Sequence, residues 1–164
     1  MIADVIGLFF ENTSLIAFGL AFLLGIVGFI RRANNEKGHL WEPLEFWMLF
    51  LFVGLVGIYT FVLHCFWPNL AAEGIGWSNS PFQWEVGIAN AVVGVLGLLS
   101  LKASRQFRLA TVIAVSIWLW GDAVGHVHQM VVANNFAPGN AGPWFWTDVV
   151  GPITLIMIHI FNRK

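Results

Sequence analysis

Ionisable side chains are rare in this chain, and several of them fall inside long apolar runs. Asp122, His126 and Gln129 follow one another at spacings of four and three residues, which places them on one face of a helix. Histidine can transfer protons near neutral pH, and histidine and carboxylate side chains are ordinary ligands of zinc, iron or copper. Because an ionised aspartate at the centre of a membrane helix costs about 2.5–3.5 kcal/mol, such residues normally face the bundle interior.

Four more polar side chains are candidates for the same site. They are His64, Glu85, Asn90 and Asp148. The ligands expected for a bound metal are His64, Glu85, Asp122 and His126, since a ligating histidine normally has a carboxylate partner. The apolar runs contain neither a His-x-x-x-His nor a Cys-x-x-Cys pattern. The residues therefore favour no particular metal, and a metal ion and a haem both stay open as cofactors.

Three interpretations of Asp122 with His126 remain. The pair could be a buried hydrogen-bonded contact that only fixes helix packing. It could be a proton-handling or small-substrate site, with Asp122 as proton carrier or orienting group and His126 as ligand or acid/base. It could also belong to a metal or haem site. Glu85 could instead be an ordinary carboxylate in the first turn of a helix, where the helix dipole favours it. His64 could instead be a histidine that only packs between helices.

These side chains must be positioned by membrane helices. Apolar residues make up 58% of the 164 residues and charged residues only 10%, with a mean hydropathy of +0.76, which excludes a soluble globular domain. A helix needs about 20 apolar residues to cross roughly 30 Å of hydrocarbon. Runs of that kind cover residues 14–30, 43–67, 81–101, 109–132 and 143–161. We therefore expect an all-α fold, an integral membrane bundle of five transmembrane helices.

The basic residues predict how the bundle is oriented. All eight follow the first, third or fifth run: Arg31, Arg32, Lys37, Lys102, Arg105, Arg108, Arg163 and Lys164. Loops rich in lysine and arginine stay in the cytoplasm, which predicts an N-terminus outside and a cytoplasmic C-terminus. Residues 1–13 are expected to be an interfacial segment or an extension of the first span, and residues 14–164 the transmembrane domain.

This orientation places most of the intramembrane polar residues at one depth. Asp122 falls near the middle of the membrane. His64, Glu85, Asn90, His126 and Asp148 fall towards the outer face, and His39 and His159 towards the cytoplasm. The sequence thus predicts a polar pocket in the outer half of the bilayer, built from the second to fifth spans.

Two stripes of small residues are expected to be helix contact faces. One contains Ala17, Ala21, Gly25 and Gly28, and the other Gly87, Ala91, Gly94 and Gly97. The partner helix could belong to the same chain, to a second copy in a homo-oligomer, or to another subunit of a membrane complex. Residues 80–83, Ser-Pro-Phe-Gln, predict a helix start closed by a capping box. A net charge of −1 gives no reason to expect a nucleic-acid partner.

Three stretches carry a resemblance to a known family. They are SPFQWEVGIAN at 80–90, GDAVGH at 121–126 together with Gln129, and NFAPGNAG at 135–142. The chain resembles, over roughly residues 40–160, a family of small prokaryotic multi-span membrane proteins catalogued as a domain of unknown function. The resemblance implies a multi-pass protein of a prokaryotic inner membrane and supplies no activity, substrate or cofactor.

The function expected is binding or relay of a small ligand, a metal ion or protons in the polar pocket. The alternative is a non-catalytic accessory subunit of a larger membrane complex, whose buried polar residues only specify packing. The chain contains no nucleophile elbow, phosphate-binding loop, dinucleotide glycine pattern or kinase signature. Whether it is an enzyme therefore stays open.

Overall fold

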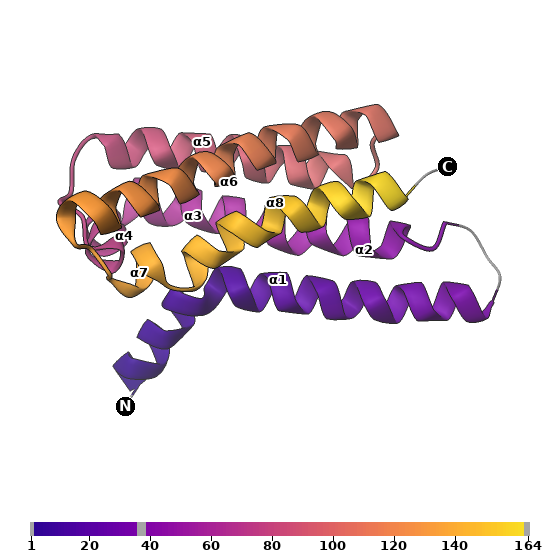
Figure 1. Ribbon diagram of the computed structural model, residues 1–164, viewed down its shortest axis with the longest axis horizontal. Coiled ribbons are helices and arrows are strands. Elements are labelled where there is room, and N and C mark those ends of the chain that lie inside the picture. Colours follow the sequence, from indigo (N-terminus) through magenta and orange to yellow (C-terminus); the bar gives the residue numbers. More distant parts are fainter. Residues whose placement is uncertain (1, 36–38, 163–164) are drawn as a thin grey trace.

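The computed structural model describes residues 2–35 and 39–162, and this part of the chain is entirely helical, without strands (Figure 1). The elements are α1 (Ile2–Asn34), α2 (Glu42–Trp47), a π-helix η1 (Met48–Leu55), α3 (Val56–Phe66), α4 (Pro68–Ile75), α5 (Phe82–Ser100), α6 (Arg105–Ala133), α7 (Pro138–Ala141) and α8 (Pro143–Phe161). Five helical segments are long and apolar enough to cross a membrane, which confirms the expected all-helical, five-span architecture.

The five spans run side by side, with α1 along one side of the bundle and α5 and α6 along the other (Figure 1). The short helices α4 and α7 lie at one end. The opposite end carries the end of α1, the α5–α6 connection and the end of α8 (Figure 1). Arg31, Arg32, Lys102, Arg105 and Arg108 belong to these segments, so the described basic residues lie at the end remote from α4 and α7.

The first helix passes through the polar residues that separate the expected N-terminal segment from the first span. Asn12 donates to the Leu8 carbonyl at 2.8 Å, and Thr13 donates to the Phe9 carbonyl at 2.7 Å. These bonds satisfy the polar side chains within the helix itself. The polar residues are therefore no helix boundary, although the first turns of α1 turn away from the bundle (Figure 1). An interfacial location for residues 1–13 stays a prediction.

The second span is not a uniform α-helix, because its middle third is the π-helix η1. All eight residues of η1 are apolar or glycine, and Met48, Leu49, Phe52 and Val53 are buried in the core. The core continues into the facing helices through Val112, Val115, Leu155 and Ile158. π-Helices are rare and local features of longer helices. Here η1 fills the middle of the bundle and separates the polar groups at its two ends.

Small residues bring the spans together within one chain. A Cβ added to Gly57 would lie 2.6 Å from the Gly94 backbone, and one added to Gly97 would lie 2.8 Å from the Gly54 nitrogen. On the other stripe, a Cβ on Gly25 would lie 2.7 Å from Leu44. Both stripes expected from sequence are thus contact faces, and in each case the partner is the second span of the same chain.

The start of α5 corrects one expectation. The helix begins at Phe82, one residue after Pro81, and the Ser80 hydroxyl accepts from the Phe82 backbone N–H at 3.3 Å. The predicted capping box is wrong, because the Gln83 side chain turns into the bundle and bonds His64. The Gln83 amide is thus buried against the His64 imidazole and does not contact the backbone at the helix start.

Candidate functional site

A cavity of about 490 Å³ lies among the spans at the end of the bundle that carries α4 and α7. Its wall is mainly apolar. The polar side chains on the wall are Glu11, Ser14, Thr60, His64, Asn90, Asp122, His126, Thr147 and Asp148. They come from all five spans, while α4 contributes Leu70, Ala71, Gly74 and Ile75 and α7 contributes Gly139. The volume lies within the range of small-molecule sites in proteins. The expected polar pocket is therefore present, and α1 adds to the four spans that the sequence predicted.

The His126 ring is held in one orientation by Asn140 of α7. The Asn140 side-chain amide donates to the His126 carbonyl at 3.2 Å and to the Asn135 carbonyl at 2.9 Å. Its oxygen therefore faces His126 Nδ1, at 2.8 Å, and can only accept there. Nδ1 must carry a hydrogen, so Nε2 is the ring nitrogen that gains or loses a proton.

Two carboxyl groups share the cavity with this nitrogen. Asp148 Oδ2 lies 3.6 Å from His126 Nε2, and the Asp148 residue is 7% exposed. Asp122 lines the same cavity from α6. The pairing expected from spacing is Asp122 with His126. The structure instead pairs His126 with Asp148, because α8 presents its carboxyl to the ring across the helix interface.

His64 reaches the cavity from the second span. Its Nδ1 lies 2.6 Å from Gln83 Oε1, a carbonyl oxygen that accepts from the ring, so its second nitrogen is the basic one. Gly57, Thr60 and His64 are all buried, and their spacing of three and four places them on one face of α3. Each histidine of the cavity thus has one nitrogen held by an amide and one left for proton exchange.

Asn90 lines the cavity in a structural contact between two spans. Thr60 Oγ1 lies 3.1 Å from Asn90 Oδ1, and the Asn90 amide donates to the Val86 carbonyl at 3.0 Å. These bonds satisfy both side chains between α3 and α5. Asn90 therefore holds the wall of the cavity together.

Two predicted site residues lie outside the cavity. Glu85 is exposed, because it stands about 200° around α5 from the buried Gln83. Gln129 shares the face of Asp122 and His126 on α6 but lies beyond the cavity wall. Within residues 2–35 and 39–162, no three histidine, cysteine or acidic side chains lie together as a metal site. The structure does not bring His64, Glu85, Asp122 and His126 together, because Glu85 lies outside the cavity, and metal binding by these residues stays a prediction.

The family assignment follows from residues 11–164, which match the model of a family described as Family of unknown function (DUF6790). The chain belongs to this family. The family expected from the resemblance is confirmed, and the match takes in the first span and the C-terminus as well. No curated protein and no solved structure matches the chain.

This DUF6790 chain has a second buried polar cluster, at the end of the bundle remote from the cavity. Glu45 is 1% exposed and accepts from Arg108 at 3.0 Å, from His159 at 2.6 Å and from Asn162 at 2.7 Å. Three donors from the fourth and fifth spans thus meet at one carboxylate of the second span. The cluster ties these spans together beneath η1.

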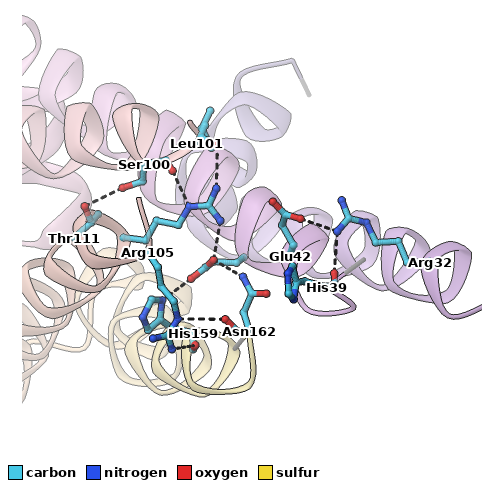
Figure 2. Close-up of polar contacts among 11 residues, drawn as sticks. Arg32, His39, Glu42, Ser100, Leu101, Arg105, Thr111, His159 and Asn162 are labelled. Carbon is cyan, nitrogen blue, oxygen red and sulfur yellow. Dashed lines mark hydrogen bonds and ion pairs between the residues drawn. The ribbon is translucent and has the colours of Figure 1, made fainter. Parts of the chain in front are cut away.

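Arg108 of this cluster and the nearby Arg105 also cap helix ends. Arg108 donates to the Ser100 and Leu101 carbonyls at the end of α5, at 3.0 and 3.2 Å. Arg105 donates to the His159 and Asn162 carbonyls at the end of α8, at 3.2 and 3.3 Å (Figure 2). The last carbonyls of a helix lack partners within it, and a cation there is also favoured by the helix dipole. These basic residues therefore stabilise the end of the bundle.

The burial of Glu45 is not evident from the sequence. Glu45 lies near the start of a helix, where an acidic side chain is common, and its partners are 63, 114 and 117 residues away in the chain. The signal available in the sequence was the depth of these residues relative to the predicted spans. Glu45, Arg108 and His159 all fall near the same end of their spans, in the same way that the cavity residues do.

Proposed function

We propose that this protein is a multi-pass protein of a prokaryotic cytoplasmic membrane that binds a small, largely apolar molecule in its cavity and exchanges a proton there. The observation that carries the proposal is the cavity itself. The cavity has a volume of about 490 Å³, and its mainly apolar wall carries Asp122, Asp148, His126 and His64. Ionisable groups at membrane depth are rare and belong to ligand sites, ion pathways and proton relays by default.

Proton exchange is supported by the way the histidines are held. Each has its Nδ1 fixed by a side-chain amide oxygen, which leaves Nε2 as the basic nitrogen. His126 Nε2 lies 3.6 Å from the Asp148 carboxyl, a distance that a small shift or one water molecule would bridge. A carboxyl and an imidazole at this separation can pass a proton between them when a ligand enters or leaves.

The proposed orientation puts the cavity on the outer side. The described basic residues gather at the end remote from α4 and α7, and the positive-inside rule places that end in the cytoplasm. The N-terminus is then outside. The cavity with His126 lies in the outer half of the bilayer, and the Glu45 cluster lies in the inner half.

Labelling of introduced cysteines tests the orientation. In a Cys65→Ser background, Ser78→Cys and Gln106→Cys place single thiols at exposed positions on opposite ends of the bundle. We expect a membrane-impermeant maleimide to label Ser78→Cys in intact cells and Gln106→Cys only after the membrane is opened. The reverse pattern would show that the cavity faces the cytoplasm.

Accessibility of the cavity tests the site without knowledge of its ligand. Gly125 lines the cavity, and a Cβ there meets no atom within 4 Å. Gly19 has the same free space but lies exposed on the lipid side of α1. Because only a hydrated thiol ionises, we expect methyl methanethiosulfonate to modify Gly125→Cys roughly tenfold faster than Gly19→Cys. Equal, slow modification would mean that the cavity admits no small molecule, and the proposal would fail.

The role of an accessory subunit has lost part of its support. Both small-residue stripes, which suited contact with another protein, pack against the second span of the same chain. Co-purification of a stoichiometric membrane partner would still favour that role, and it stays a prediction.

A further inference from the structure

We propose that the cavity selects an organic cation, a molecule with a positively charged nitrogen on an apolar body. This inference rests on the proposed function and names the chemical class of its ligand. The first support is the charge of the wall. Three acidic residues line the cavity, Glu11, Asp122 and Asp148, and among the described residues on the wall none is a lysine or an arginine.

The carboxyl groups have few partners within the protein. Asp148 has an ion-pair contact with His126 at 3.6 Å and no hydrogen bond, and Asp122 has neither within the described part of the chain. Buried charges are normally paired and hydrogen-bonded. Two acidic side chains with so few partners on one apolar wall therefore favour a ligand that brings a positive charge to them.

A second observation, independent of the acidic residues, indicates a missing ligand or water. Ser14 is 1% exposed, lines the cavity, and its hydroxyl has no hydrogen-bond partner. The carbonyl that a helical serine commonly bonds, four residues earlier, is Phe10, and it accepts from the Trp144 indole at 3.3 Å instead. The indole nitrogen of Trp118, also on the wall, is likewise buried without a partner.

Aromatic rings make up much of the remaining wall. They belong to Phe10, Phe52, Trp77, Phe82, Trp118 and Trp144. The face of an aromatic ring attracts a cation within about 6 Å, and this attraction is strongest where water is excluded. Carboxylates together with aromatic rings are therefore the combination that binds alkylammonium groups and their apolar substituents.

An inorganic ion fits the same wall less well. Calcium takes six to eight oxygen ligands and magnesium an octahedral set, whereas the described chain brings no three histidine, cysteine or acidic side chains together. An anion would meet the repulsion of the carboxylates with no arginine or lysine on the wall to offset it. The apolar area of the cavity also needs a ligand with an apolar body.

The test uses three probes of one shape and different charge: benzylammonium, benzyl alcohol and benzoate. Each is added to full-length Gly125→Cys protein, with Cys65→Ser, in lipid nanodiscs, and protection of the thiol from methyl methanethiosulfonate is measured. Hydrogen bonds to charged groups contribute more free energy than those between neutral groups. We therefore expect benzylammonium to protect the thiol at roughly tenfold lower concentration than benzyl alcohol. Benzoate is expected to give no protection.

Carboxyl variants then assign the charge preference to the wall. Asp122→Asn and Asp148→Asn are each expected to raise the protecting concentration of benzylammonium about tenfold and to leave that of benzyl alcohol unchanged. Glu85→Gln is the matched control, because Glu85 is an exposed carboxylate outside the cavity. Helicity by circular dichroism and the elution volume in size-exclusion chromatography identify a variant that fails to fold. If one aspartate variant fails to fold, the variant of the other aspartate provides the test.

The outcomes separate this inference from the proposed function. Equal protection by the cation and the alcohol would overturn the cation class and leave the cavity as a ligand site. Rapid modification with no protection by any of the three probes would also overturn it and would favour a site for protons alone. Failure of the reagent to reach Gly125→Cys would overturn the proposed function itself.

Discussion

Glu45→Ala is expected to lower the free energy of unfolding by about 3–5 kcal/mol, the range measured when one partner of a buried ion pair is removed. The substitution leaves Arg108 without its carboxylate and takes the acceptor from His159 and Asn162, all three in contact with Glu45. The buried atoms His159 Nε2 and Asn162 Oδ1 already have no hydrogen-bond partner, so the cluster is incompletely satisfied even before the carboxylate is removed. Reversible unfolding in mixed detergent micelles, followed by circular dichroism, measures the change.

Glu42→Ala is the matched control for this prediction. Glu42 lies three residues before Glu45 in the same helix and pairs with Arg32 at 2.7 Å, but both side chains are 36% exposed (Figure 2). Exposed ion pairs contribute about 0–1 kcal/mol. If the two variants lose the same stability, the Glu45 cluster is not the contact that ties the three spans together.

Gly57→Ala is expected to cost about 1–3 kcal/mol, although alanine is the better helix former. The added Cβ would lie 2.6 Å from the Gly94 nitrogen and Cα and 2.9 Å from the Asn90 carbonyl oxygen. These are backbone atoms of α5, so the helices must separate. Separation would also lengthen the Thr60 to Asn90 contact in the wall of the cavity. Thermal unfolding and the rate of modification of Gly125→Cys report both effects.

Gly19→Ala supplies the comparison. Gly19 lies in the middle of α1 with no atom within 4 Å of an added Cβ, so alanine should leave stability unchanged or raise it by up to about 1 kcal/mol. A loss at Gly19 equal to the loss at Gly57 would show that the glycines of this chain act through backbone freedom. The close approach of α3 and α5 would then not explain the result.

Much of the architecture could be read from the sequence because its causes are local. Each span needs its own run of apolar residues, and the fifth run, 143–161, coincides with α8. The glycine stripes were also visible, since spacings of three and four define one helix face. The short helix α4 also has local causes, because Pro68 starts it and Gly76, in the left-handed conformation, ends it. It was not among the elements expected from sequence.

The candidate site could be predicted only in part. His64, Asp122, His126 and Asp148 do share one cavity, because residues at equal depth on interior faces must meet somewhere in the bundle. Glu85 has the right depth but stands on the outer face of α5. Depth follows from position in the sequence, whereas the facing direction depends on how each helix is rotated.

The sequence by itself determined five helical runs long and apolar enough to cross a membrane, with most of their polar groups at one depth, since hydrophobic length and charge distribution act along the chain. Tertiary structure decided which polar groups are partners. His126 forms a hydrogen bond with Asn140 and lies close to Asp148, and the Glu45 carboxylate pairs with Arg108 and His159. The rotation and axial alignment of the helices bring these distant residues into contact. Those two variables arise only when all five spans pack together, and no local pattern encodes them.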